Sequence, residues 1–308
     1  MSMKEGALIA VRDCMNVRPN ETVLVVTDEV KRDVGRAIYD AADLASEAFL
    51  LTMKPRETDG QEPPEPVALA MKSVDVVLAP TDKSITHTKA REQACSVGAR
   101  VATLPGVTSE MMAEGGMQAD YGWVEEKANS LYDKLNGSKK ARITSEEGTD
   151  LSFDLEGRKW NRDTGICKNP GESTNLPGGE VYISPASAEG KLVIDGSVSG
   201  LGLLDSPLTV EIEDGYGVSF HGERADEFEE ILRNAGKPGR NVAELGIGIN
   251  PAASLIGVTL EDEKVAGTLH VAFGDDSTIG GQNEASVHLD GLITSNPTLQ
   301  VDGTDIEL

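Results

Sequence analysis

The first 137 residues alternate between short apolar runs and segments with helical periodicity. The β-branched run at 22–28 (TVLVVTD) predicts a buried strand, and the segment at 30–45 predicts a helix. Its apolar face is expected at Val34, Ile38, Ala41 and Leu44. Further strands are expected at 48–54, 74–80 and 100–106, with helices at 65–73 and 87–98. This alternation indicates βαβ units and a doubly wound parallel sheet, without a glycine-rich nucleotide-binding motif at any strand-to-helix junction.

The pattern changes after a helix predicted at 121–137. Residues 140–157 form two alternating runs around a glycine-containing turn, which predicts a β-hairpin. Beyond this point strands dominate, with one clear helix expected at 224–236. The fold class is therefore α/β: an N-terminal Rossmann-like domain at 1–137 and a C-terminal α+β domain at 138–308.

Composition narrows the possible partners. The chain of 308 residues has 52 acidic and 28 basic residues, a net charge of −24, which argues against binding nucleic acid. One interpretation of this acidity is a solubilising surface, whether or not the protein works in a saline habitat. The alternative is that some of the carboxylates bind a divalent cation. Three widely spaced cysteines without CxxC fit a reducing compartment. No signal-peptide pattern and no apolar run of about 18 residues is present, so a cytoplasmic protein without membrane contact is expected.

Two of the four histidines, His270 and His288, lie near the end of the chain, and Asp290 follows the second by two residues. In TLHVAFG (268–274), His270 points to the side opposite its apolar neighbours. In SVHLDG (286–291), His288 and Asp290 project together from one side. Two imidazoles and one carboxylate suit Zn, Co, Mn or Fe(II). The alternative is a pair of ordinary half-buried histidines with hydrogen-bond partners.

Two glutamates extend this candidate metal site. Glu180 follows a Pro-Gly-Gly turn at the start of a strand, and Glu244 interrupts an apolar strand. A buried carboxylate without a partner is costly, so Glu244 is not expected to be buried alone. Alternatively, Glu180 is a solvated turn residue and Glu244 points outward from an edge strand.

Four motifs in order, NLPGGEV, AELGIGINP, DEKVAGTLHVAFG and NEASVHLDG, resemble the leucyl aminopeptidase group that includes aminopeptidases T and S, which are dinuclear metalloaminopeptidases. The resemblance covers most of the chain. It implies an N-terminal α/β domain, a C-terminal metal-bearing domain, a homodimer, and metal ligands at Glu180, Glu244, His270, His288 and Asp290. One position departs from the family: Ser277 stands where a tyrosine follows the first metal histidine by seven residues.

The main prediction is a metal-dependent aminopeptidase that removes N-terminal residues from peptides. Two divalent ions (Zn, Co or Mn), bridged by Glu180 or Glu244, would activate a water molecule. Glu263 is the candidate general base, with a solvated turn glutamate as the alternative. The glycine-rich segments 244–251 and 274–283 are expected to leave room for a peptide backbone.

Two other functions stay open. His270, His288 and Asp290 alone also fit a mononuclear non-haem Fe(II) ring-cleaving dioxygenase of the dihydroxypyridine type, and such enzymes resemble the same scaffold. Retention of Glu180 and Glu244 counts against it, because a single iron does not need them. The third possibility is a non-catalytic binding protein stabilised by its metal.

Overall fold

A computed structural model describes residues 2–308 and divides into two compact units. Unit 1 contains the chain up to Glu125 together with Asp163–Gly178, and unit 2 contains Glu126–Arg162 together with Gly179–Leu308. The expected organisation had a single boundary at residue 137. The chain instead leaves unit 1 within helix α6 (Tyr121–Leu135), returns to it after Arg162, and leaves it again after Gly178.

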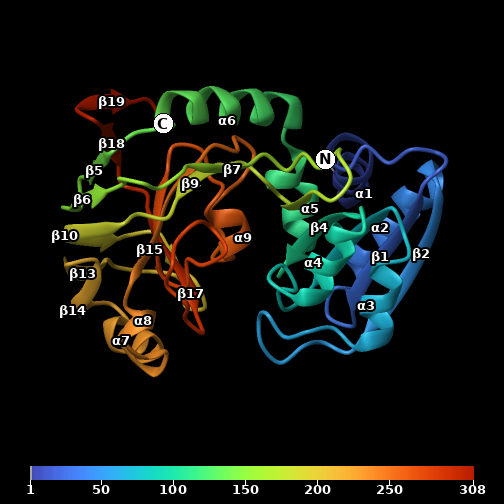
Figure 1. Ribbon diagram of the computed structural model, residues 1–308, viewed down its shortest axis with the longest axis horizontal. Helices are drawn as coiled ribbons and strands as arrows, with labels where there is room; N and C mark the ends of the chain where they lie inside the picture. Colours follow the sequence, from blue (N-terminus) through green and yellow to red (C-terminus); the bar gives the residue numbers. More distant parts are fainter. Residues whose placement is uncertain (1) are drawn as a thin grey trace. The chain divides into compact units, whose positions relative to one another are not determined.

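Unit 1 is built on a parallel five-stranded sheet with the order β2-β1-β3-β4-β8 (Figure 1). Its strands are β1 (Thr22–Asp28), β2 (Glu47–Met53), β3 (Val76–Thr81), β4 (Arg100–Pro105) and β8 (Ser173–Asn175). The chain runs outward from β1 to β2 and then crosses to β3 on the other side of β1. Because such crossovers are right-handed, the helix after β1 and the helix after β2 lie on opposite faces. The predicted doubly wound α/β fold is confirmed.

The helices predicted at 30–45, 65–73 and 87–98 are present in unit 1, together with four short helices that were not predicted. They are α1 (Met3–Leu8), the π-helix η1 (Ile9–Cys14), α2 (Arg32–Ala45), α3 (Glu65–Met71), α4 (Lys89–Ser96), α5 (Ser109–Ala113) and the 3₁₀ helix η2 (Gly116–Gln118). Val34, Ile38 and Ala41 of α2 are buried, but Leu44 is 73% exposed. At 100° per residue Leu44 lies about 80° around the helix from Val34, beyond the edge of the packed face. The expected burial of Leu44 was wrong for this reason.

Unit 2 contains two seven-stranded sheets (Figure 1). The first, in the order β14-β13-β10-β6-β5-β18-β19, consists of β5 (Lys140–Thr144), β6 (Asp150–Asp154), β10 (Ser187–Ile194), β13 (Leu208–Glu213), β14 (Tyr216–Gly222), β18 (Thr298–Val301) and β19 (Thr304–Ile306). The second, in the order β12-β11-β17-β16-β15-β9-β7, consists of β7 (Asn161–Asp163), β9 (Glu180–Ile183), β11 (Ser197–Val198), β12 (Gly202–Leu203), β15 (Val242–Gly248), β16 (Leu269–Gly274) and β17 (His288–Ile293). The antiparallel pair β5–β6 confirms the predicted hairpin.

An aromatic cluster ties the two sheets together. Phe228 of α7 (Ala225–Asn234) meets Phe220 of the first sheet and Phe273 of the second edge-on, with ring centroids 6.0 and 5.7 Å apart. Phe228 is fully buried, so the helix closes one end of the core between the sheets. Two short helices, α8 (Gly236–Gly239) and α9 (Thr259–Asp262), complete the unit.

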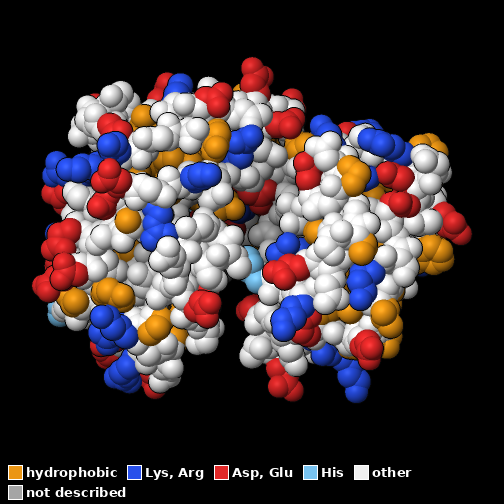
Figure 2. All heavy atoms as spheres, in the orientation of Figure 1, with side chains coloured by type: hydrophobic (Ala, Val, Ile, Leu, Met, Phe, Trp, Pro, Cys, Tyr) orange, Lys and Arg blue, Asp and Glu red, His pale blue; other side chains and the backbone are white. Residues whose placement is uncertain are grey.

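The surface carries both signs of charge. On the face shown in Figure 2, lysine and arginine side chains are interspersed with acidic ones. None of the helices within residues 2–308 is long and apolar enough to cross a membrane.

Candidate metal centre

The second sheet of unit 2 brings all five predicted ligands to one of its faces. Residues directly opposite one another on antiparallel strands share a face, and positions two apart on one strand share it as well. The register pairs Glu180 with Gly248, His270 with Gly246, His288 with Gly274, and both Glu244 and Asp290 with Ala272. Each predicted ligand therefore stands opposite a glycine or an alanine.

These small residues make room for the protein's own atoms. A Cβ at Gly246 would overlap the imidazole of His270, reaching 2.6 Å from its Cδ2 and closer still to its Nε2. A Cβ at Gly248 would lie 2.9 Å from the carbonyl carbon of Lys264. The expectation that these glycines leave room for a peptide backbone was wrong: side chain and loop fill the space beside β15.

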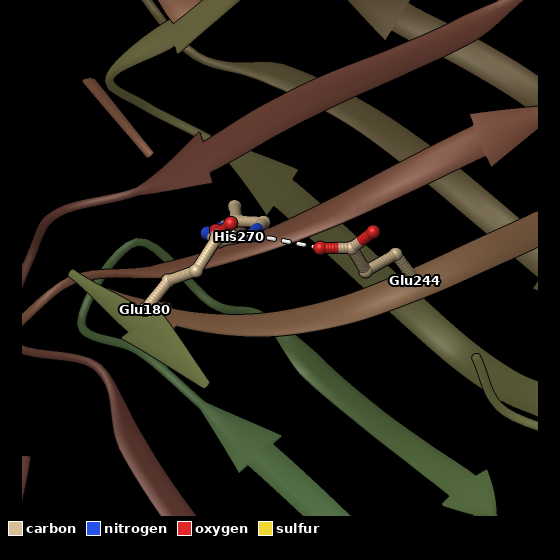
Figure 3. Close-up of side chains that lie close together, drawn as sticks. All are labelled: Glu180, Glu244 and His270. Carbon is tan, nitrogen blue, oxygen red and sulfur yellow. Dashed lines mark hydrogen bonds and ion pairs between the residues drawn. The ribbon is translucent and has the colours of Figure 1, made fainter. Parts of the chain in front are cut away.

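Glu180, Glu244 and His270 form the tightest cluster of candidate metal ligands (Figure 3). His270 Nε2 lies 3.2 Å from Glu244 Oε1 and 3.4 Å from Glu180 Oε2. One donor atom of each residue lies within 4.8 Å of the others. All three side chains are buried, so Glu244 does not point outward from an edge strand and Glu180 is not a solvated turn residue.

Glu244 also connects this cluster to the second histidine. Its Oε2 lies 3.5 Å from His288 Nε2, which is itself 3.7 Å from Asp290 Oδ1. The other ring nitrogen of His288, Nδ1, lies 2.7 Å from the carbonyl oxygen of Asp275. When the ring is neutral, a hydrogen bond from Nδ1 to that carbonyl leaves Nε2 without a proton, which is the tautomer that metal ligation needs.

The loop between the two histidines is folded against itself. Ser277, at the position of the family's tyrosine, donates from its backbone N–H and from its hydroxyl to Asp275 Oδ1, at 3.1 and 2.8 Å. The backbone N–H of Ala285 donates to the other oxygen of Asp275 at 2.9 Å. The serine therefore helps to fix the segment that holds His288.

Asp290 is held by a hydroxyl pair. Ser199 Oγ accepts from the backbone N–H of Asp290 at 2.9 Å and donates to its Oδ2 at 3.2 Å. Thr259 Oγ1 in turn donates to Ser199 Oγ at 2.9 Å. These contacts leave Oδ1 of Asp290 directed at His288.

Sequence reasoning missed Lys264, the only buried cation among the described residues of the cluster. Its Nζ lies 2.5 Å from Glu180 Oε1 and 2.6 Å from Glu263 Oε1, and its side chain is fully buried. The candidate base Glu263 is thus ion-paired rather than solvated. A lysine embedded in the acidic run EDEKVAG (261–267) looks like a surface residue, and nothing in this local pattern indicated burial.

Burial and charge shift the pKa values of the cluster in opposite directions. Burial raises the pKa of Glu180 to about 8, against the opposing charge of Lys264. Burial acts to lower the pKa of His270, but the hydrogen bond to Glu244 and the surrounding carboxylates outweigh it and raise the pKa to about 9. The same balance raises the pKa of His288, while the imidazoles keep the pKa values of Glu244 and Asp290 below their ordinary range despite burial. The imidazoles thus carry protons where a metal ion would carry charge.

The donor set fits a divalent metal ion. Glu180 Oε2 is buried without a hydrogen bond among the described residues, and His270 Nε2 lies 3.4 Å from it. The second imidazole, His288, approaches Glu244 instead. Nitrogen and oxygen donors of this kind suit Zn, Co, Mn and Fe(II). A cation bound here would satisfy the carboxylate and offset the excess negative charge.

The sequence matches the family model of NicX, 2,5-dihydroxypyridine 5,6-dioxygenase, over residues 8–307. Among solved structures, 2,5-dihydroxypyridine dioxygenase from Pseudomonas putida KT2440 is similar with a TM-score of 0.84 and 16% sequence identity, covering 99% of this chain and 95% of that one. AmpT from Thermus thermophilus is similar with a TM-score of 0.70 and 19% identity, covering 99% and 96%. A comparison with curated proteins gave no match. At these identities both structures show a shared two-domain fold.

The comparisons correct the main functional prediction. The likeness to AmpT supports the aminopeptidase fold, but the family match and the dioxygenase structure contradict a peptidase, and with it the hydrolase class. The chain is that of an enzyme, and the mistake arose because one scaffold serves two chemistries. Since the NicX model spans nearly the whole sequence, the chain belongs to the 2,5-dihydroxypyridine 5,6-dioxygenase family.

Proposed function

We propose that this protein is a mononuclear Fe(II) dioxygenase that cleaves the ring of a dihydroxypyridine. The match of the NicX family model over residues 8–307 carries this proposal. The proposed ligands are His270, His288 and Asp290, the two-histidine, one-carboxylate set that leaves positions open for oxygen and substrate. Glu244 faces both imidazoles and is a fourth donor within reach. When bound, Fe(II) supplies the redox chemistry that lets dioxygen react with an electron-rich ring.

The family's printed substrate defines the reaction to be tested. Cleavage between C5 and C6 of 2,5-dihydroxypyridine converts the hydroxyl-bearing C5 into a carboxyl carbon and leaves a formyl group on the ring nitrogen. Both oxygen atoms enter the product, so substrate and O₂ react one to one and no external reductant is needed.

The protein's own residues orient the site and handle a proton. The Asp275 carbonyl fixes the ring of His288, and Ser199 fixes the carboxylate of Asp290. Burial raises the pKa of Glu263, against the opposing charge of Lys264. Its carboxylate is our proposed acceptor for the proton of a substrate hydroxyl, because a base with a pKa nearer neutrality transfers protons more effectively.

The test is oxygen uptake by protein purified anaerobically and loaded with Fe(II). With 2,5-dihydroxypyridine we expect one O₂ consumed per substrate, loss of the aromatic absorbance, and two ¹⁸O atoms in the product from ¹⁸O₂. His270→Ala should lose both iron and activity, whereas Glu180→Ala should keep its iron. Iron-loaded protein that consumes no oxygen with any dihydroxypyridine isomer contradicts the proposal. The predicted homodimer remains a prediction, which light scattering on the purified protein tests.

A further inference from the structure

A buried lysine stands where a second metal ion would bind. Two-metal sites hold their ions about 3.5–4 Å apart and share carboxylates between them. In this cluster Glu180 is the carboxylate placed to be shared, because its Oε2 lies 3.4 Å from His270 Nε2 and its other oxygen, Oε1, contacts a different partner. Lys264 Nζ lies between Glu180 Oε1 and Glu263 Oε1, at 2.5 and 2.6 Å. We propose that Lys264 takes the place of a second cation and restricts the centre to one metal ion.

The lysine is held there by the fold. Its carbonyl accepts a hydrogen bond from the backbone N–H of buried Asn250 at 2.8 Å, and its own N–H donates to the carbonyl of Glu261 at 3.1 Å. Its backbone lies directly over Gly248 of β15, where a Cβ would collide with it. The ammonium group therefore cannot withdraw to solvent without moving a segment that is anchored on both sides.

Charge explains why the ammonium group excludes a second ion. A divalent ion binds carboxylate oxygens at about 2.0–2.2 Å. To bind between Glu180 and Glu263 it would have to take the same two oxygens that Lys264 Nζ contacts. It would then lie against a positive charge in a buried site, where like charges repel strongly. The cluster can accept either the ammonium group or the second ion.

This role of Lys264 explains why a site for a single metal ion contains Glu180. With one iron the glutamate would be a surplus buried carboxylate, and Lys264 neutralises it. The lysine also fixes Glu263, which the proposed mechanism uses as a proton acceptor. Lys264 is thus a positioning residue that sets the metal stoichiometry, an inference that rests on the proposed single-ion centre.

The test is metal stoichiometry, with Co²⁺ as the probe. Metal-free wild-type protein, Lys264→Met, Lys264→Arg and the exposed-lysine control Lys140→Met are each equilibrated with excess Co²⁺, freed of unbound ion and analysed for cobalt per folded chain. We expect one ion in wild type, Lys264→Arg and Lys140→Met, and two in Lys264→Met. Electron paramagnetic resonance should show isolated Co²⁺ in wild type and a spin-coupled pair in Lys264→Met. The double variant Lys264→Met/Glu263→Gln should return to one ion, because it lacks a ligand for the second.

Two ions in wild type, or one ion in folded Lys264→Met, overturns the inference. If Lys264→Met does not fold, Lys264→Gln replaces it and is judged by the same stoichiometry, because its amide still donates a hydrogen bond toward Glu180. The outcome is separable from that of the proposed function. If Lys264→Met binds two Co²⁺ ions where wild type binds one, but iron-loaded wild type takes up no oxygen, the role of Lys264 is supported and the dioxygenase is contradicted. If wild type takes up oxygen but Lys264→Met still binds one ion, the dioxygenase is supported and the role of Lys264 is contradicted.

Discussion

Gly246 offers the sharpest test of how the metal centre is built. The backbone at this position is outside the left-handed region, so alanine meets no conformational penalty there. The new methyl group would instead overlap the imidazole of His270, 2.6 Å from Cδ2 and nearer to Nε2. Among the described residues Nδ1 of His270 has no hydrogen-bond partner, so only packing and Nε2 contacts orient the ring. Gly246→Ala should therefore displace the ring.

Two quantities measure that displacement. Overpacking a core position costs about 1–3 kcal/mol of the free energy of unfolding. For a chain of this size each kcal/mol lowers Tm by about 2–4 °C. Thermal unfolding of the metal-free variant gives this cost, and Co²⁺ titration gives the loss of metal affinity, which we expect to be at least tenfold. Gly196→Ala is the matched control: its Cβ would lie 2.7 Å from Thr294 Cγ2, so it should lower Tm but leave Co²⁺ affinity unchanged.

A double-mutant cycle decides whether the imidazole is the cause. In a His270→Ala background the obstructing ring is gone, so adding Gly246→Ala should cost close to nothing. If Gly246→Ala destabilises the His270→Ala protein as much as it destabilises wild type, the steric account is refuted. Retention of wild-type Co²⁺ affinity by Gly246→Ala alone would refute the proposed place of His270 in the centre.

Three further predictions concern other parts of the molecule. The pKa of His270 is raised from 6.5 to about 9, so its protonated form stabilises the metal-free fold below pH 6.5, and this contribution is lost as the pH rises through 9. Without metal, Tm measured from pH 6 to 9.5 should therefore fall. The gain in Tm on adding Co²⁺ should grow with pH. Ser199→Ala frees the carboxylate of Asp290 and should weaken Co²⁺ binding roughly tenfold or more with Tm of the metal-free protein lowered only slightly, as isothermal titration and thermal scans would show. In unit 1, Glu21→Gln leaves the guanidinium of Arg100 buried without its counter-charge. A urea titration should show the free energy of unfolding lowered by about 3–5 kcal/mol, and an unchanged midpoint would contradict this account.

Local sequence pattern was a reliable guide to unit 1. The run at 22–28 is strand β1 residue for residue, and the helix face of Val34, Ile38 and Ala41 is buried as periodicity requires. What periodicity does not contain is the return of the chain after Arg162. Strand β8 (Ser173–Asn175) joins β4 as the edge of the first sheet from more than 60 residues away, and three residues without apolar alternation give no local signal. Long-range pairing of this kind is decided by tertiary packing.

The candidate centre was predictable as far as alternation along strands applies. Period-two geometry places His288 and Asp290 on one face and His270 on the face it shares with Gly246, as the cross-strand register then shows. Glu244 was predicted to belong to the site because a carboxylate in an apolar strand needs a partner. In the structure it lies between two imidazoles. Whether these side chains bind metal stays a prediction.

Lys264 lay beyond the reach of that reasoning, and in our proposal it sets the number of metal ions. A motif records which donors are present, and Glu180 counts as one whether a metal ion or an ammonium group compensates its charge. Only the folded chain shows that Oε1 of Glu180 is already paired with a buried cation at 2.5 Å. Counting Glu180 as a metal ligand supported a dinuclear peptidase. If Glu180 is instead the partner of Lys264, the two histidines and Asp290 remain for one ion, with Glu244 as a fourth donor. In our proposal a lysine within an acidic run therefore decides whether the centre holds one metal ion or two.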